Sequence, residues 1–76
     1  MKTEYKYIRF EQSGVGSGVG DKLTTRWICL NKKHGDRLGM VCWYQAWKQF
    51  VFQPDNADFS ASCLVDIIDF MKQLED

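Results

Sequence analysis

The stretch from Leu38 to Pro54 constrains the fold of this chain more than any other part of the sequence. Five of its 17 residues are aromatic, and valine, cysteine and methionine accompany them. Such a run favours two short strands joined by a tight turn, because aromatic and β-branched side chains suit a pleated, half-buried surface. Pro54 should end the second strand, since proline has no N–H to donate to a ladder. The sequence therefore predicts a β-hairpin that anchors the domain.

The rest of the chain predicts two further strands and one helix. We expect strands at about residues 4–11, 24–31, 38–44 and 47–53, with Gln45 and Ala46 forming the tight turn before the last strand. Gly35 should supply the left-handed residue of the preceding hairpin loop. Ser60 is a candidate N-cap for a helix over about residues 60–74. The apolar residues of this helix recur at the spacing of one face: Leu64, Ile67, Ile68, Met71 and Leu74. The polar residues Ser62, Asp66, Asp69 and Gln73 lie away from that face and should be solvated.

Short connections make neighbouring strands antiparallel. The expected architecture is a single α+β domain over residues 1–76, in which a four-stranded antiparallel meander carries one C-terminal helix on one face. Strand alternation places one set of side chains toward the helix: Trp27, Cys29, Val41, Trp43, Phe50 and Phe52. The opposite face then carries Arg26, Ile28, Leu30, Met40, Cys42, Tyr44 and Val51.

That opposite face is unusually apolar for a surface left in water. One helix cannot cover both faces of a sheet. We therefore expect the free face, or an edge strand, to meet a second copy or another partner, with the interface formed by Ile28, Leu30, Met40, Tyr44 and Val51. The alternative is a scattered set of exposed apolar residues, which is ordinary on small proteins.

Composition excludes several classes of protein. The chain has 76 residues, 45% hydrophobic content and no apolar run near the roughly 20 residues that a membrane span needs. Its first residues lack an apolar signal region, and its three cysteines are odd in number and widely spaced. These features predict a cytoplasmic protein with free, inert thiols. The formal net charge of zero argues against binding to duplex nucleic acid.

No catalytic or metal-binding pattern stands out, so we expect neither an enzyme nor a cofactor. The glycine-rich run from Ser13 to Gly20 is followed by a strand pattern rather than a helix, which favours a flexible hairpin loop over a phosphate-binding loop. A mobile flap over a ligand, with Lys22 and Arg26 nearby, is the alternative. His34 is the single histidine and stands in a turn, where it has no nucleophile or metal-ligand spacing around it.

Aromatic and basic residues cluster near the third turn. Aromatic faces beside cations suit a nucleobase or nucleotide through stacking and charge. The candidate ligand-binding residues are Arg26, Arg37, Tyr44, Trp47 and Lys48. The structural alternative is that Trp43 belongs to the core and Trp47 packs at the end of the sheet.

A longer pattern of residues resembles a class of short proteins from bacteriophages and integrated mobile elements. It reads His34-Gly35-Asp36-x-Leu38-Gly39-x-Val41-x-Trp43-Tyr44-x-x-Trp47-Lys48-Gln49-Phe50-x-Phe52-x-Pro54, followed by Phe59-Ser60-x-x-Cys63-Leu64-x-Asp66-Ile67-x-x-Phe70. The resemblance covers Trp27 to about Leu74 and implies no catalytic residue. Short phage proteins often act by stoichiometric binding, including the blocking of host defence proteins or the sequestration of their nucleotide signals.

The resemblance therefore implies a small non-enzymatic viral binding protein, with a possible counter-defence role inside the bacterial host. The leading hypothesis is a self-associating protein that holds a small anionic ligand such as a cyclic nucleotide. Two alternatives stay open: an inhibitor that docks on a host protein through the open sheet face, and a single-stranded nucleic-acid binder that uses aromatic residues on that face.

Overall fold

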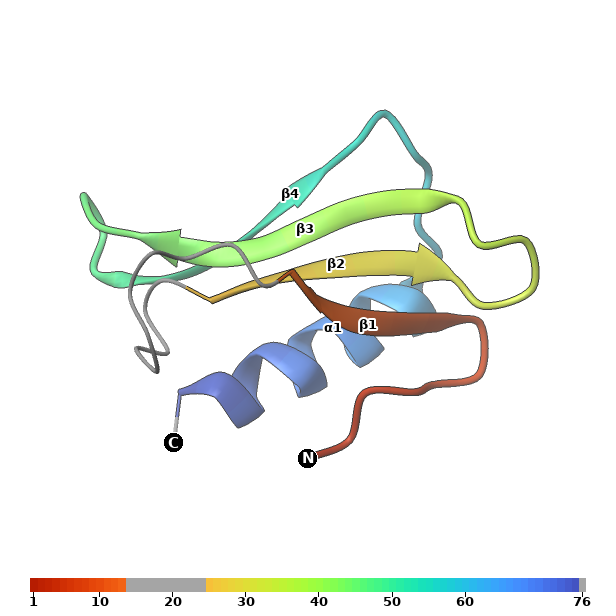
Figure 1. The fold of residues 1–76 in the computed structure, drawn as a ribbon, viewed down its shortest axis with the longest axis horizontal. Coiled ribbons are helices and arrows are strands. Elements are labelled where there is room, and N and C mark those ends of the chain that lie inside the picture. The colour runs from red at the N-terminus through yellow and green to blue at the C-terminus, as the bar shows by residue number, and fades with distance from the viewer. Residues whose placement is uncertain (14–24, 76) are drawn as a thin grey trace.

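The computed structural model describes residues 1–13 and 25–75. They form one antiparallel sheet of four strands with a single helix against one face, so the predicted α+β fold is confirmed (Figure 1). The strand order β1-β2-β3-β4 is that of a meander. The elements are β1 (Ile8–Ser13), β2 (Arg26–Asn31), β3 (Arg37–Tyr44), β4 (Gln49–Pro54) and α1 (Ala61–Leu74). The run from Gly14 to Gly20, for which a hairpin loop was expected, lies outside the described residues, as does Lys22.

The first strand begins four residues later than the sequence pattern indicates. The chain folds back at residues 6–7, where the Tyr5 N–H donates to the Ile8 carbonyl at 2.9 Å. Thr3 and Tyr5 then run beside β1, and the Phe10 N–H donates to the Thr3 carbonyl at 2.9 Å. The apolar residues of this region suggested one continuous strand, whereas two of its segments pair with each other. The N-terminal segment therefore covers the outer edge of β1.

The core lies between the helix and the sheet face that the alternation pattern assigns to it. Cys29, Val41 and Phe50 are buried, and Trp27, Trp43 and Phe52 pack partly against them. The helix contributes Phe70, whose ring stacks on Phe10 with centroids 3.9 Å apart and meets Trp27 edge-on at 5.2 Å. The prediction of which strand residues face the helix is confirmed.

The predicted left-handed glycine is present in the β2–β3 turn, where Gly35 has φ +77°. The Asn31 side-chain oxygen accepts hydrogen bonds from the backbone N–H groups of Lys33 and His34, both at 2.9 Å. This arrangement is an Asx-type turn, in which the side chain replaces a backbone acceptor. A register shift between Cys29 and Leu30 follows at the turn end of the hairpin.

The β3–β4 turn is longer than the predicted two residues. It spans Gln45 to Lys48, so β4 begins at Gln49 rather than at Trp47. The Trp47 and Lys48 N–H groups donate to the carbonyls of Tyr44 and Gln45, both at 3.2 Å, and Lys48 adopts φ +53°. A tight two-residue turn would need a residue that favours positive φ at its centre, and neither Gln45 nor Ala46 does. Trp47 therefore belongs to the turn, and its side chain is 65% exposed.

Helix α1 begins at the predicted cap, because the Ser60 hydroxyl accepts a hydrogen bond from the Cys63 N–H at 3.2 Å. Its buried face matches the predicted one in part, because Ile67 is buried and Met71 and Leu74 pack partly against the core. Ile67 and Phe70 are buried, whereas Leu64 and Ile68 are largely exposed. The i, i+3, i+4 pattern admitted two overlapping stripes, and the aromatic rings of β1 and β2 select the stripe that contains Phe70.

Two helix residues expected to be solvated instead hold the N-terminal segment. The Tyr5 hydroxyl donates to Asp69 Oδ2 at 2.8 Å, and Gln73 Nε2 donates to the Tyr5 hydroxyl oxygen at 3.2 Å. Gln73 also exchanges two hydrogen bonds of 2.8 Å with the Lys2 backbone. Tyr5 thus connects the edge of the sheet to the helix. Burial, followed by the hydrogen bond to the Asp69 carboxylate, raises the pKa of Tyr5 above its ordinary value.

Replacing Tyr5 with phenylalanine is expected to lower the free energy of unfolding by about 1 kcal/mol at neutral pH, since one hydrogen-bonding group is lost. Because the pKa of Tyr5 is raised on folding, its protonated form stabilises the native state fully below about pH 10, and that contribution is lost as the pH rises further. Urea unfolding at about pH 8 and at about pH 11 should show a smaller alkaline loss in Tyr5→Phe than in the parent chain. Tyr7→Phe, which alters an exposed tyrosine next to the same segment, should retain the full loss. An equal alkaline loss in both variants would contradict this assignment.

All three cysteines are free, as expected. Cys29 is fully buried, whereas Cys42 and Cys63 are partly buried. Burial, with a smaller effect of the nearby Cys63, raises the pKa of the Cys29 thiol to about 12. A thiol that stays protonated is a poor nucleophile, so Cys29 acts as a small apolar core residue.

Candidate functional site

The aromatic part of the predicted ligand site is assembled at the β3–β4 turn. The rings of Tyr44 and Trp47 meet edge to face with centroids 4.9 Å apart, and both residues are exposed. Lys48 follows directly in the same turn. Trp43 is a separate feature, because its ring packs on Phe50 at 5.2 Å at the end of the core. The exposed pair forms a small aromatic surface at this turn.

The two predicted arginines lie at opposite ends of the sheet. Arg26 begins β2, and its neighbour Trp27 pairs with Val41, so Arg26 lies toward the Tyr44 end of β3. Arg37 begins β3 and is therefore seven residues from Tyr44, roughly 23 Å along an extended strand. Its side chain is also engaged, since Arg37 Nε lies 2.6 Å from Asp55 Oδ2. The structure does not bring Arg37 together with the other candidate residues.

The predicted interface residues share the sheet face opposite the helix. Ile28, Met40 and Gln53 form one row across β2, β3 and β4, and Cys42 with Val51 forms the next. Tyr44 is exposed, whereas Ile28, Leu30, Met40 and Val51 are each partly buried. Arg9 and Glu11 of β1 stand beside Leu30 and Ile28 on this face and form an ion pair. The face is thus apolar at its centre and charged along β1.

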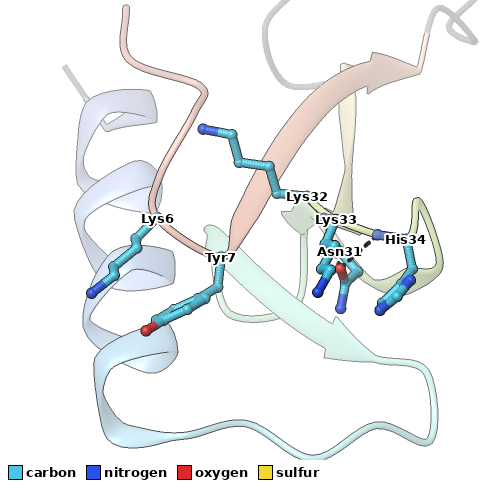
Figure 2. Close-up of a pocket in the computed structure, with 6 residues that line it drawn as sticks. All are labelled: Lys6, Tyr7, Asn31, Lys32, Lys33 and His34. Carbon is cyan, nitrogen blue, oxygen red and sulfur yellow. Dashed lines mark hydrogen bonds between the residues drawn. The ribbon is translucent and has the colours of Figure 1, made fainter.

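A second group of basic residues surrounds a cavity at the other end of the sheet. The cavity has a volume of about 410 Å³ and lies between the β2–β3 turn and the fold-back before β1 (Figure 2). We call it the basic cavity, and its lining residues are Lys6, Tyr7, Asn31, Lys32, Lys33 and His34. The volume falls within the range of roughly 300–1,000 Å³ that small-molecule sites occupy.

The side chains of the basic cavity differ in direction. Figure 2 shows Tyr7, Asn31, Lys33 and His34 extending to one side, whereas Lys32 extends the other way. Lys32 Nζ donates to the Tyr5 carbonyl at 3.0 Å and lies 3.5 Å from Glu4 Oε1. Lys32 is therefore used to hold the N-terminal segment. Its role at the cavity is to line the wall.

The other basic side chains of the cavity are available to a ligand. The Lys6 ammonium lies 5.2 Å from the centroid of the Tyr7 ring, and the ring is about half exposed. Lys33 and His34 make no side-chain ion pair among residues 1–13 and 25–75. Asn31 uses its oxygen for the turn, which leaves its NH₂ group as a donor. The site combines N–H donors, positive charge and one aromatic face.

Sequence reasoning missed this site. Lys6 and Tyr7 are separated from Lys33 and His34 by more than 25 residues, and the pairing of β1 with β2 is what joins them. The contact is made directly by the Lys32 N–H, which donates to the Tyr7 carbonyl at 2.9 Å. The one available signal is the basic run Lys32-Lys33-His34 at a hairpin turn, which by itself predicts a polar loop with an idle histidine.

Within residues 1–13 and 25–75, no group of three or more His, Cys, Asp or Glu side chains could hold a metal ion. The single described helix is too short and too polar to cross a bilayer. Comparison of the chain with protein-family models, curated proteins and solved structures finds no match. The chemistry of the basic cavity is therefore the basis on which a function can be argued.

Proposed function

We propose that this protein is a small non-catalytic binding protein that captures a phosphate-bearing small molecule, such as a nucleotide, in the basic cavity. The observation that carries the proposal is that the ammonium groups of Lys6 and Lys33 and the imidazole of His34 line one cavity together with the exposed ring of Tyr7. Phosphate oxygens accept charge-assisted hydrogen bonds from such donors, and an aromatic ring accepts a nucleobase by stacking.

Local charge supports an anionic ligand. Of the acids at this end of the sheet, Glu4 pairs with Lys32 on the side away from Lys33 and His34, and Asp55 pairs with Arg37. Asp36 stands in the same turn as Lys33 and His34, so one acid accompanies the two ammonium groups of Lys6 and Lys33. The protein as a whole has no net charge, so long-range attraction to polyanions is weak. A compact anion held by a few local donors suits this charge distribution better than a duplex does.

The biological context of the proposal comes from the resemblance to short phage and mobile-element proteins. A protein of this kind acts stoichiometrically, and a nucleotide bound to it is withdrawn from the host enzymes that respond to it. We therefore propose sequestration of a nucleotide signal, for instance a cyclic nucleotide, as a counter-defence role. The aromatic surface of Tyr44, Trp47 and Lys48 is the competing location for the same ligand.

The test is thermal denaturation and calorimetric titration with inorganic phosphate, a mononucleotide, a cyclic mononucleotide and a cyclic dinucleotide. At a ligand concentration of about 100 times Kd, stabilisation of roughly 2.7 kcal/mol is expected, which raises Tm by several degrees. Lys33→Ala should weaken binding at least about tenfold, the loss of roughly 1.4 kcal/mol that one charge-assisted hydrogen bond supplies.

Lys48→Ala is the matched control, since it removes an exposed lysine from the other hairpin turn. Retained binding in Lys48→Ala with loss in Lys33→Ala supports the basic cavity. The reverse result places the ligand on the aromatic surface instead. Absence of any Tm shift across the four ligands would discard the proposed function.

A second candidate function is docking on a host protein. It is favoured by the exposed edge-to-face pair of Tyr44 and Trp47, since exposed tyrosine and tryptophan are enriched among residues that dominate protein interfaces. The ligand panel separates the two functions, because docking predicts no response to nucleotides.

A further inference from the structure

The two edges of the sheet are treated differently by the fold. The outer edge of β1 is covered by the N-terminal segment, through the Thr3–Phe10 and Tyr5–Ile8 hydrogen bonds described above. At the opposite edge, β4 pairs with β3 on one side only (Figure 1). Among residues 1–13 and 25–75, no hydrogen bond from another segment reaches the free side of Phe50 or Phe52. Strand β4 therefore presents an unpaired edge.

The direction of each backbone group on β4 follows from one hydrogen bond. The Asp55 N–H donates to the Leu38 carbonyl at 2.9 Å, so Asp55 faces β3. Because backbone groups alternate along an antiparallel strand, Gln49, Val51 and Gln53 also face β3. Phe50 and Phe52 then direct their N–H and C=O groups outward. Pro54 also faces outward, in the position where a missing N–H costs nothing.

The sequence of β4 is symmetric about Val51. Residues 49–53 read Gln-Phe-Val-Phe-Gln in either direction. An antiparallel pair centred on Val51 would place Val51 opposite its copy and Phe50 opposite Phe52 of the other chain. This register satisfies all the outward N–H and C=O groups of Phe50 and Phe52, with four hydrogen bonds between the two chains. Shifting the register by two residues toward Pro54 leaves a carbonyl of each Phe50 without a donor.

The side chains of β4 allow the same arrangement. No residue from Gln49 to Pro54 is charged, so two identical edges meet without repulsion. Proteins usually protect a free edge with charged or bulged residues, and β4 has only the terminal Pro54. We propose that β4 is a homodimer interface, in which two copies pair antiparallel about a two-fold axis at Val51 to form one continuous eight-stranded sheet. This inference is independent of any ligand.

A disulfide test distinguishes this register from every other contact. In the proposed dimer the two Val51 Cα atoms form a non-hydrogen-bonded pair about 4.5 Å apart, within the range that a disulfide spans. The Gln49 residues of the two chains would lie two residues from the axis on opposite sides, and so roughly 14 Å apart. The background variant is Cys42→Ser/Cys63→Ser, because Cys42 is the cross-strand neighbour of Val51 and would otherwise trap the new thiol.

In that background, Val51→Cys should give a disulfide-linked dimer under mild oxidation, whereas Gln49→Cys and Gln53→Cys alone should remain monomeric in a denaturing gel. An equal mixture of Gln49→Cys and Gln53→Cys should give the mixed dimer. Equal cross-linking of all three single variants, or none for Val51→Cys, would overturn the proposed register.

Native mass spectrometry of the unmodified chain over a wide concentration range provides the second measurement. A concentration-dependent dimer is expected.

A backbone N-methyl group at Phe52 can be introduced by chemical ligation at Cys42. It should weaken the apparent dimer affinity at least tenfold, because that N–H faces outward, while the circular dichroism spectrum is preserved. Ile28→Lys tests the sheet face, and it should leave the dimer intact. If Ile28→Lys abolishes the dimer while the N-methylated protein still dimerises, the edge interface is rejected in favour of face-to-face pairing. A monomer at every concentration would reject the interface altogether.

Discussion

Replacing Phe70 with alanine is expected to lower the free energy of unfolding by about 3–5 kcal/mol. Phe70 is 0% exposed, and its ring joins the helix to both N-terminal strands through Phe10 and Trp27. A domain of this length has roughly 4–11 kcal/mol of stability in total, so the loss removes much of it. Urea unfolding monitored by tryptophan fluorescence measures the change, and the variant should be partly unfolded in water if the parent stability lies near the lower end.

The control for this prediction is Ile68→Ala, two residues away on the same helix. Ile68 is 52% exposed, so its truncation should cost less than about 1 kcal/mol. The pair also tests whether the aromatic rings, rather than the apolar repeat, select the buried helix face. Comparable losses in the two variants would show that both stripes of the helix are buried.

The second large effect is expected at Gly39, in the middle of β3. A Cβ atom at this position would lie 2.5 Å from Phe52 Cζ and 2.7 Å from the Gln53 carbonyl oxygen. Both separations are shorter than real contacts, and the carbonyl belongs to the adjacent strand and cannot move freely. Gly39→Ala should therefore lower the free energy of unfolding by about 3 kcal/mol through strain between β3 and β4.

The double variant Gly39→Ala/Phe52→Leu examines the cause of this strain. Leucine removes the ring atoms that meet the new methyl group, whereas the contact with the Gln53 carbonyl remains. The combined loss should be smaller than the sum of the two single losses, with a coupling energy of about 1 kcal/mol. Additive losses would assign the effect of Gly39→Ala to the strand backbone instead of to Phe52.

Local patterns were sufficient to predict the elements. Alternation in β2, β3 and β4 identified the core face, Gly35 marked its turn through its need for positive φ, and Ser60 marked the helix start. These signals are intrinsic to a few neighbouring residues, so no tertiary information is needed to interpret them. The predicted length of the β3–β4 turn and the predicted first residue of β1 were wrong. In each case two backbone pairings are compatible with local propensity, and tertiary contacts decide between them.

The candidate site, in contrast to the elements, could be predicted only in part from local patterns. Tyr44, Trp47 and Lys48 are close in sequence and were found together, whereas Arg37 was placed with them on composition and lies at the other end of β3. The basic cavity could not be predicted, since Lys6 and Tyr7 reach Lys33 and His34 only through the fold-back of the N-terminal segment and the pairing of β1 with β2.

Sequence by itself determined the strand and helix inventory, the face of the sheet that becomes the core, and the symmetric Gln49–Gln53 edge. These depend on periodicity and side-chain chemistry, which are properties of short stretches of chain. Tertiary structure alone decided that Phe70 rather than Ile68 enters the core, that Tyr5 holds the helix, and that Lys6 lines one cavity with the distant pair Lys33 and His34. Each of those outcomes depends on the relative position of segments far apart in the chain, which only the packing of helix on sheet defines.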